Sequence, residues 1–318
     1  FARAGGIGAR NIARWDGESW HPFGSGMNGA VSSLALFDGK LVAAGYFTEA
    51  DGLPVGYIAQ WDGSQWQPLG AGMDAPVYAL AVYDGELIAG GLFLMAGGAP
   101  ANRVARWDGA AWSPLGTGTD SSVRALAVHD GELVAGGTFW YAGGVDGHYV
   151  ARWNGSTWFS LGTGCNNSVW SLASHGGQLF IGGLFTQAGG LAVGRVAGLQ
   201  GGVWSTLAGG VTGGSVLALA PYEDGVAAGG AFTQAGGGPA NNVAVWTGSS
   251  WRPLGQGTLG LNYAVRQVGP RLFVGGPWTQ AGGMQSDCIA YWLDPASALP
   301  APADRALVLL HPPQPNPC

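Results

Sequence analysis

The sequence predicts an all-β fold, namely a β-propeller of four-stranded antiparallel blades. First, a tryptophan followed by a tight turn recurs at Trp15, Trp61, Trp107 and Trp153, in steps of 46 residues. Second, each repeat contains four short apolar runs separated by glycine-rich turns, which suit strands and leave no room for helices of ordinary length. Third, a single four-stranded sheet cannot bury both of its faces, whereas copies packed face to face around a ring can.

The repeat covers nearly all of residues 1–293, which we predict to form the propeller domain. The same register returns at Trp246 and Trp292, with Leu199 in the one skipped position. A second tryptophan follows five residues later in most copies: Trp20, Trp66, Trp112, Trp158, Trp204 and Trp251. Residues 294–318 fall outside the repeat, and their first part has the composition of a Pro/Ala-rich linker.

Residues 77–116 show the elements of one repeat in order. The first strand begins with VYALA at Val77, and the Asp84-Gly85 turn leads to the second strand, ELIAGG. An Ala-Gly-Gly loop leads to the third strand, VARW, and the Asp108-Gly109 turn leads to the fourth, AWSPLG. Asp-Gly between apolar runs is typical of a type I′ hairpin turn, in which both central residues have positive φ angles.

The number of blades follows from the number of first strands. Complete units begin near Val31, Val77, Val123, Val169 and Val216. The N-terminus adds a third and a fourth strand, and the C-terminus adds a first, a second and a third strand. We therefore predict six blades, the closing blade being shared by both termini, which removes the open sheet edge. One third strand is left over, so seven blades remain the alternative.

Composition excludes several classes of partner. The chain has 60 Gly and 18 Pro, but 47% of its residues are hydrophobic, so it can bury a large core and is not simply disordered. Its formal net charge is −6, Lys40 is its one lysine and no basic run occurs, so we expect no nucleic-acid partner. No apolar stretch approaches the roughly 18 residues of a membrane span, so we expect no membrane insertion.

The repeat also resembles a known superfamily. The Gly-Gly pairs that follow the second strands, such as Gly90-Gly91 and Gly136-Gly137, and the tryptophan that opens the fourth strand resemble kelch-like β-propeller repeats. The wording FTQAGG…NNVAVWTGSSWRPLG resembles more closely the repeats of fungal cortical polarity-marker ectodomains and of bacterial secreted propeller proteins. The final LVLLHPPQPNPC resembles the start of a C-terminal sorting module, here truncated. These resemblances imply a non-enzymatic propeller that is secreted or lies on the cell surface.

The longer loops predict which face binds a ligand. The Asp-Gly turns lie on one face, and the loops that join blades or follow the second strand lie on the other, where they vary between repeats. The second position of the first strands varies too: Ser32, Tyr78, Arg124, Trp170, Leu217 and Tyr263. If first strands line a central channel, aromatic side chains and an arginine gather at its mouth, which suits hot-spot contacts or stacking on sugars.

The ligand-binding candidates are therefore Tyr78, Arg124, Trp170 and Tyr263, together with Trp140, Tyr141 and His148 of the most elaborate loop. The alternative is that these side chains plug the channel or pack between blades. For the two tryptophan columns we favour packing between blades over sugar platforms, because every blade has them.

Other polar residues have structural interpretations. Single aspartates 46 residues apart, such as Asp16, Asp62 and Asp108, fit turn chemistry better than a calcium site, which needs six to eight converging oxygens. The five histidines share no metal spacing, and no metal or other cofactor is expected. The three cysteines, Cys165, Cys288 and Cys318, form no CxxC motif, and we favour unrelated buried or capping cysteines over one pair and a free thiol.

Three functions compete. The first is a secreted or cell-surface scaffold for binding a protein or glycan, or for extracellular assembly through a surplus strand or the C-terminal tail at Leu307–Leu310. The alternative is a lectin. The third, an enzyme, ranks last, because the first-strand column holds one charged residue, Arg124, and the sequence contains no catalytic motif.

Overall fold

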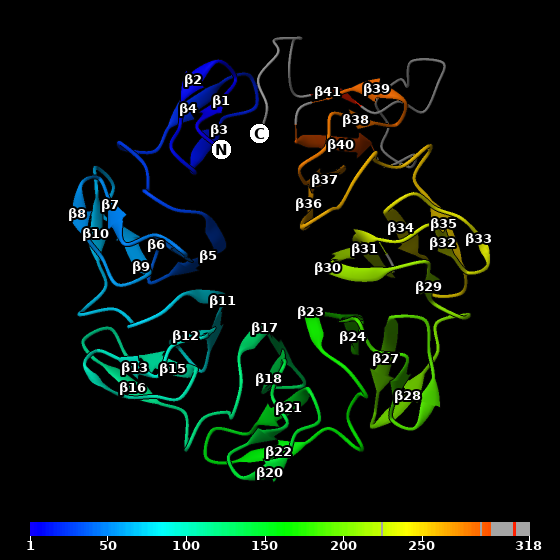
Figure 1. Cartoon of the computed structure of the whole chain (residues 1–318), viewed down its shortest axis with the longest axis horizontal. Coiled ribbons are helices and arrows are strands. Elements are labelled where there is room, and N and C mark those ends of the chain that lie inside the picture. Colours follow the sequence, from blue (N-terminus) through cyan, green and yellow to red (C-terminus); the bar gives the residue numbers. More distant parts are fainter. Residues whose placement is uncertain (224, 287, 294–307, 310–318) are drawn as a thin grey trace. The chain divides into compact units, whose positions relative to one another are not determined.

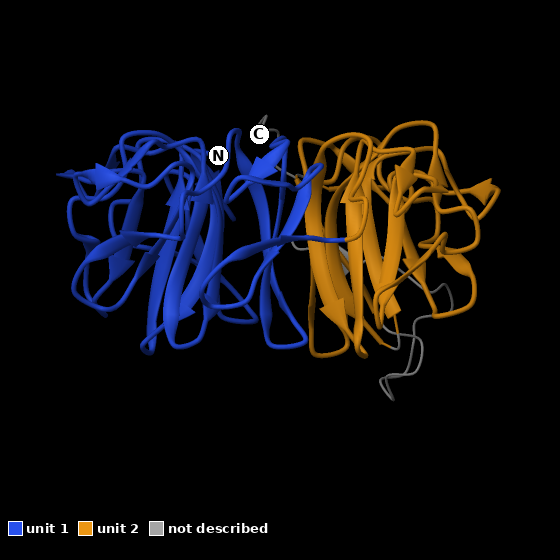
Figure 2. Ribbon diagram, turned by 90° about the horizontal axis from the view of Figure 1, so that it is seen from below, with its two compact units in different colours: residues 1–161 blue, residues 162–318 orange. Residues whose placement is uncertain are grey.

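The computed structural model describes residues 1–223, 225–286, 288–293 and 308–309, and these residues form strands and turns without a helix. They therefore include no helix that could span a membrane. The chain divides into two compact units, Phe1–Leu161 and Gly162–Cys318 (Figure 2). The Pro/Ala-rich linker and most of the predicted sorting-type segment, within residues 294–318, lie outside the described residues.

The first unit contains three four-stranded antiparallel sheets, each running from first to fourth strand as the repeat predicts (Figure 1). Their strands are β5 (Val31–Phe37), β6 (Lys40–Gly45), β9 (Ile58–Trp61) and β10 (Trp66–Pro68); β11 (Val77–Tyr83), β12 (Glu86–Gly91), β15 (Val104–Trp107) and β16 (Trp112–Pro114); and β17 (Val123–His129), β18 (Glu132–Gly137), β21 (Val150–Trp153) and β22 (Trp158–Ser160). A two-stranded sheet of β3 (Ala13–Trp15) and β4 (Trp20–Pro22) precedes them.

The second unit contains three further four-stranded antiparallel sheets. Their strands are β23 (Val169–His175), β24 (Gln178–Gly183), β27 (Val196–Gln200) and β28 (Val203–Ser205); β30 (Ser215–Tyr222), β31 (Gly225–Ala231), β34 (Val243–Trp246) and β35 (Trp251–Pro253); and β36 (Ala264–Val268), β37 (Arg271–Gly275), β40 (Ile289–Leu293) and β41 (Val308–Leu309).

The Ala-Gly-Gly segments after the second strands are ordered hairpins rather than plain loops. Gly97 and Gly98 have φ angles of 60° and 84°, which closes a two-residue turn between β13 and β14. The small strands are β1 (Arg3–Ala4), β2 (Ile7–Gly8), β7 (Glu49–Ala50), β8 (Leu53–Pro54), β13 (Met95–Ala96), β14 (Ala99–Pro100), β19 (Tyr141–Ala142), β20 (Val145–Asp146), β25 (Gln187–Ala188), β26 (Leu191–Ala192), β29 (Val211–Thr212), β32 (Gln234–Ala235), β33 (Gly238–Pro239), β38 (Gln280–Ala281) and β39 (Met284–Gln285).

The two classes of Asp-Gly turn differ from each other. Between first and second strands, Asp84 and Gly85 have φ angles of 52° and 77°, which confirms the predicted type I′ turn. Between third and fourth strands the prediction is wrong. There the Asp62 carboxylate accepts the backbone N–H groups of Ser64 (2.8 Å) and Gln65 (2.9 Å), so a side chain closes a longer loop. This confirms that turn chemistry explains these aspartates.

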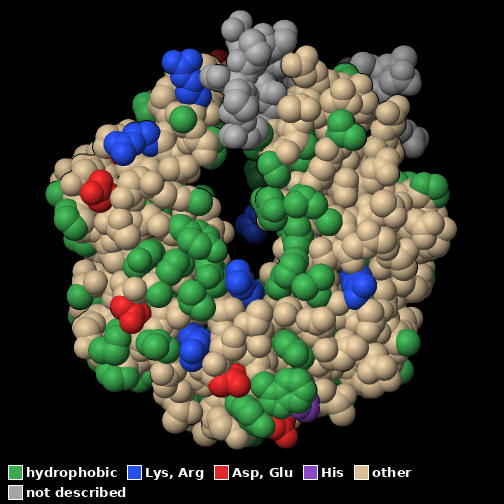
Figure 3. All heavy atoms as spheres, viewed as in Figure 1, with side chains coloured by type: hydrophobic (Ala, Val, Ile, Leu, Met, Phe, Trp, Pro, Cys, Tyr) green, Lys and Arg blue, Asp and Glu red, His purple; other side chains and the backbone are tan. Residues whose placement is uncertain are grey.

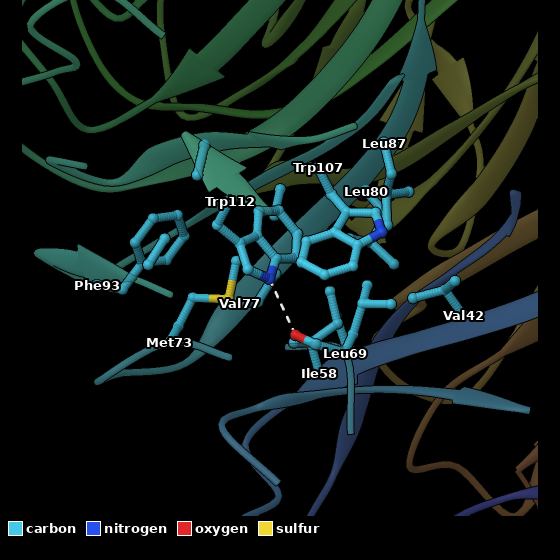
Figure 4. Close-up of a cluster of buried hydrophobic side chains, with 14 of the residues drawn as sticks. Val42, Ile58, Leu69, Met73, Val77, Leu80, Leu87, Phe93, Trp107 and Trp112 are labelled. Atoms are coloured by element: carbon cyan, nitrogen blue, oxygen red, sulfur yellow. Dashed lines mark hydrogen bonds between the residues drawn. The ribbon is translucent and has the colours of Figure 1, made fainter. Parts of the chain in front are cut away.

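The tryptophan columns form the core between neighbouring blades. Trp107 and Trp112 are each 7% exposed, and their ring centroids lie 5.4 Å apart. The Trp112 indole Nε1–H donates to the carbonyl oxygen of Leu69, at the end of the preceding blade, at 2.9 Å (Figure 4). Trp66, Trp158 and Trp251 donate in the same way to Phe23, Leu115 and Leu207. These tryptophans serve packing between blades, as predicted.

The Gly-Gly pairs allow adjacent blades to approach closely. A Cβ atom added to Gly90 of β12 would lie 2.5 Å from the Cγ1 atom of Val123 and 3.3 Å from Leu126, both in β17 of the next blade. Gly182 meets Val216 at the same 2.5 Å in the second unit. At Gly90 and Gly182, glycine therefore lets a second strand pack closely against the first strand of its neighbour, whereas β6 has Ala44 at the equivalent position.

The terminal strands differ from the predicted sharing of one blade by both termini. β41 pairs with the outer edge of β40, with Tyr291 opposite Val308, while β3 pairs only with β4 among the described residues. β41 follows β40 closely in the sequence, and pairing between strands that are near in sequence costs little loop-closure entropy. Apart from the small hairpins, the described strands therefore make six four-stranded sheets and the two-stranded sheet of β3 and β4; the number of blades in the closed ring stays a prediction.

Candidate binding site on the loop face

The loops between blades and the hairpins after the second strands lie at the same end of each sheet and are fastened together. The Asp74 carboxylate accepts the backbone N–H groups of Leu94 (2.9 Å) and Met95 (3.0 Å), and Asp120 holds Trp140 and Tyr141 in the same way. Asn28 and Asn166 make the equivalent contacts in their own blades. The repeated carboxylate or amide turns this loop face into a fixed surface whose other side chains can vary.

Tyr78, Arg124 and Tyr46 form a cluster on this face, which we call the tyrosine–arginine cluster. Tyr78 and Arg124 are the second residues of the first strands of two consecutive blades, and the Arg124 guanidinium carbon lies 4.2 Å from the centroid of the Tyr78 ring. Tyr46, which follows β6, places its ring centroid 5.6 Å from that of Tyr78. The Arg124 Nε–H donates to the Ser122 hydroxyl at 3.3 Å. The arrangement combines a cation–π contact with two hydroxyl groups.

The electrostatics of this cluster leave the arginine available. Burial raises the pKa of Tyr78, and its hydrogen bond with Tyr46 raises it further, so the ring stays neutral; the positive charge of Arg124 partly opposes this rise in pKa. Within the described part of the chain, no ion pair includes Arg124. Its exposed guanidinium can therefore donate hydrogen bonds to a carboxylate or another planar anion of a ligand.

Only some of the binding candidates predicted from the second position of the first strands lie next to one another. Within the first unit, Tyr78 and Arg124 meet as described, whereas Trp170 and Tyr263 belong to the second unit. Trp170 is half-buried in β23, and Tyr263, just before β36, is 60% exposed. Neither side chain takes part in any ring contact recorded for the described residues.

The loop candidates Trp140, Tyr141 and His148 lie close together beside β19 and β20. The Trp140 ring centroid lies 4.5 Å from that of His148 and 5.8 Å from that of Tyr149, both edge-on. Trp140 is 45% exposed and Tyr141 46%, and Tyr141 lies opposite Asp146 across the hairpin. Figure 3 shows hydrophobic side chains gathered with a histidine and acidic groups over this hairpin. We call this group the hairpin platform.

Tyr46 is not among the binding residues predicted from the sequence. Tyr46 directly follows the last glycine of its second strand, and the equivalent residues of the next two blades are Leu92 and Thr138. None of the three stands out when one repeat is read alone. Tyr46 is 50% exposed, and its ring stacks near a residue from the following blade. The signal that could have identified Tyr46 is the difference between these three residues at one position of the loop face.

The cysteines differ from the favoured interpretation. Cys288 is disulfide-bonded, whereas Cys165 is a free, buried thiol whose pKa is raised by burial. Cys165 forms an isolated backbone β-bridge with Ala188, and Met73 forms the equivalent β-bridge with Ala96 in another blade. Cys165 therefore takes the place of a core residue. Among the described residues, no three His, Cys, Asp or Glu side chains are grouped as a metal site would need.

Comparisons with known proteins agree with this architecture. A family model described as "Domain of unknown function (DUF5122) beta-propeller" matches residues 38–60 and 84–107, which hold the second and third strands of two blades. The "WD40 beta propeller domain of Doa1" is similar with a TM-score of 0.55 and 14% identity, over 90% of this chain and 84% of that one. No curated protein matches the chain. At such low identity the likeness shows the fold alone, and the chain is a β-propeller domain.

Proposed function

We propose that the chain is a non-enzymatic binding scaffold that engages a protein or glycan through its loop face. The observation that carries the proposal is the tyrosine–arginine cluster, which draws Tyr46, Tyr78 and Arg124 from three consecutive blades. The core does not need the side chains of Tyr46 and Arg124, since both are exposed. Aromatic residues and arginine dominate binding energy at protein interfaces, and here they stand on a fixed frame.

The chemistry of the cluster indicates what the ligand carries. A guanidinium without a carboxylate partner favours an anion, and bidentate pairing fits a carboxylate best. The Tyr78 ring lies under the guanidinium and fixes its position, which limits the side-chain entropy lost on binding. An acidic side chain of a protein, set beside an apolar contact to Tyr46, is the first candidate; an acidic sugar is the second.

A secreted or cell-surface location belongs to the same proposal. Cys288 is disulfide-bonded, and disulfides persist mainly in oxidising compartments. The resemblance of FTQAGG…NNVAVWTGSSWRPLG to repeats of fungal cortical polarity-marker ectodomains and of bacterial secreted propeller proteins supports the same location. Expression with and without an export signal tests it: the proposal expects a correctly folded, oxidised chain only from the oxidising compartment, and equal folding in a reducing cytosol would contradict it.

Binding is tested with arrays of acidic peptides and of glycans that contain carboxylates. We expect the unmodified chain to retain carboxylate-bearing members, and Arg124→Gln to weaken that retention about tenfold or more. The matched control is Arg152→Gln, because Arg152 already pairs with Glu132 at 2.8 Å and lies outside the cluster. Retention that is absent in the unmodified chain, or equal in Arg124→Gln, would overturn the proposal.

A lectin is the second candidate, favoured by the hairpin platform. Trp140 and Tyr141 expose nearly half of their surface beside Asp146, and exposed aromatic faces with a nearby carboxylate suit stacking on a neutral sugar. Trp140→Ala should then abolish retention of neutral glycans and leave acidic ligands unaffected. If no neutral glycan is retained at about millimolar concentration, the lectin alternative fails.

A further inference from the structure

In four blades, one side chain fastens the small hairpin that follows the second strand. The residue that carries it comes directly after the one that forms a backbone β-bridge with the hairpin, as Asp74 comes after Met73, which bridges Ala96. Its side-chain oxygen accepts the N–H groups of the residues 20 and 21 positions further along the chain, at 2.8 to 3.0 Å. We call this contact the hairpin clamp. The clamp residues are Asn28, Asp74, Asp120 and Asn166.

The hairpin of β38 and β39, in the second unit, has no such clamp (Figure 1). Leu259 stands at the clamp position, because it follows Thr258, which forms the β-bridge with this hairpin. Its side chain carries no hydrogen-bond acceptor and is 70% exposed. At the equivalent place before β32, the backbone carbonyl oxygen of Thr212 accepts the N–H of Thr233 at 3.1 Å. Leu259 is therefore the apolar exception at this position of the repeat.

The backbone around Leu259 is nevertheless placed as in the clamped blades. Thr258 forms its β-bridge with Ala281, and the Leu259 N–H donates to the carbonyl oxygen of Gln280 at 3.0 Å. Both contacts have counterparts in the clamped blades. What differs in this hairpin is the side chain at the clamp position.

Two neighbouring backbone N–H groups, those of Thr279 and Gln280, therefore lack the acceptor that their equivalents have. Gln280 lies opposite Gln285, one pair beyond the two-residue turn; such a pair is not hydrogen bonded, so the Gln280 N–H points away from β39. No residue that the structure describes accepts a hydrogen bond from either N–H. Thr279 and Gln280 are both exposed. Successive N–H groups that point the same way attract an anion.

We propose that the N–H groups of Thr279 and Gln280 bind a carboxylate from another molecule, namely an acidic side chain of a partner protein. The carboxylates of Asp74 and Asp120 fit the equivalent pairs of N–H groups in their own blades. A hydrogen bond to a carboxylate is about twice as strong as one to a neutral oxygen, which favours an acidic side chain over an amide. The site lies in the second unit and does not depend on the tyrosine–arginine cluster.

The test follows the backbone amide signals of Thr279 and Gln280 in nitrogen–proton NMR spectra of the whole chain. The aspartate compound, N-acetyl-aspartate N-methylamide, supplies a side-chain carboxylate, and N-acetylglycine supplies a terminal one. We expect the aspartate compound to shift both signals saturably, with half-saturation below about 10 mM, and the alanine analogue to have no effect. Shifts that do not saturate, or that the alanine analogue equals, overturn the proposal. Tighter binding of N-acetylglycine overturns the assignment to a side chain.

Two variants at the clamp position separate the site from its surroundings. Leu259→Asn supplies a neutral clamp like that of Asn166, so it should weaken binding of the aspartate compound about tenfold or more without adding a repelling charge. Leu259→Ala is the matched control, because it leaves the N–H pair open and should bind as the unmodified chain does. Equal binding by Leu259→Asn and Leu259→Ala overturns the proposal.

A third variant creates the site where the chain has a clamp. Asp74→Leu frees the N–H groups of Leu94 and Met95, and the aspartate compound should then shift their signals saturably as well. A folded Asp74→Leu variant that gains no such site overturns the proposal, since an open N–H pair is then not sufficient for binding. Circular dichroism shows whether each variant is folded, and the two Leu259 variants decide the proposal if Asp74→Leu is not. Arg124→Gln should leave the titration of Thr279 and Gln280 unchanged, so this proposal and the proposed function fail separately.

Discussion

The two-stranded sheet of β3 and β4, which we call the half-blade, and the complete blade from β11 to β16 lie in the same unit and carry the same pair of tryptophans. These tryptophans are fully buried only in the complete blade. Trp112 is 7% exposed and donates its indole N–H to Leu69. Trp20, its equivalent, is half-buried, and its Nε1 has no hydrogen-bond partner in the described part of the chain. The motif therefore specifies the geometry of a hairpin, while neighbouring strands supply its burial. This is expected where stability depends on nearest-neighbour interfaces.

The largest expected effect is the difference in unfolding free energy between alanine variants of these two tryptophans. Trp112→Ala should lower the free energy of unfolding by about 3–5 kcal/mol, because it opens a cavity and leaves the Leu69 carbonyl without its donor. Trp20→Ala should cost less than half as much. Urea denaturation followed by circular dichroism measures both. Equal losses would show that the half-blade is as well packed as the complete one.

The next effect concerns leucines at one position of two first strands. Leu80→Ala should lower the free energy of unfolding by about 2–5 kcal/mol, since this side chain is 9% exposed. Leu34→Ala should cost below about 1 kcal/mol, because Leu34 is 52% exposed. The same denaturation experiment applies. A large loss for Leu34→Ala would mean that another part of the molecule already covers β5.

A smaller effect is expected in acid. The backbone N–H groups of Gln65 and Ser64 hold the pKa of Asp62 well below its ordinary value of 3.8. A lowered pKa in the folded state contributes stability above the ordinary pKa, and this contribution is lost as the pH falls through and below about 3.8. The melting temperature should therefore fall between about pH 5 and pH 2, and less steeply for Asp62→Asn.

Asp62→Asn is a natural control for that experiment. Asn154 occupies the equivalent turn, where its side-chain oxygen accepts the backbone N–H groups of Ser156 and Thr157, both at 3.0 Å. Asp62→Ala removes the acceptor and should lower the melting temperature at every pH. An unchanged pH profile in Asp62→Asn would show that the Asp62 carboxylate does not contribute to the acid sensitivity.

The smallest effect is expected on the loop face. Arg124→Gln should change the free energy of unfolding by no more than about 0.5 kcal/mol, because Arg124 is exposed and makes no ion pair with the other described residues. Thermal unfolding measures this change. A clearly destabilised variant would assign the tyrosine–arginine cluster to the fold rather than to binding.

Periodicity predicts the parts of the fold that every repeat shares. The strands, the type I′ turns at Asp84-Gly85 and the buried tryptophans follow from short-range rules of spacing and turn conformation. The turn at Asp62 escaped prediction because Asp-Gly fits two turn geometries, and a side-chain hydrogen bond decides between them. The pairing of β41 escaped because a tail outside the repeat carries no periodic signal.

The candidate site is less accessible from sequence than the fold. Tyr78 and Arg124 stand out because they occupy a first-strand position that varies between repeats while its neighbours stay apolar, and the structure places them in contact. Tyr46 comes from another loop, so only packing reveals that it joins them. Trp170 and Tyr263 occupy the same position of the repeat, yet neither makes a ring contact among the described residues. A shared position in the repeat indicates where along the strand a side chain lies, but not which side chains lie next to it.

Hydrogen exchange tests the central contrast most directly. Mass spectrometry of peptic fragments compares residues 13–15 of β3 with residues 104–107 of β15 in the unmodified chain. Because β15 lies between β12 and β16, while β3 pairs only with β4 among the residues that the structure describes, we predict rapid exchange in β3 and slow exchange in β15. Equal protection of the two strands would contradict the account, because it would mean that β3 already has a strand on its inner edge.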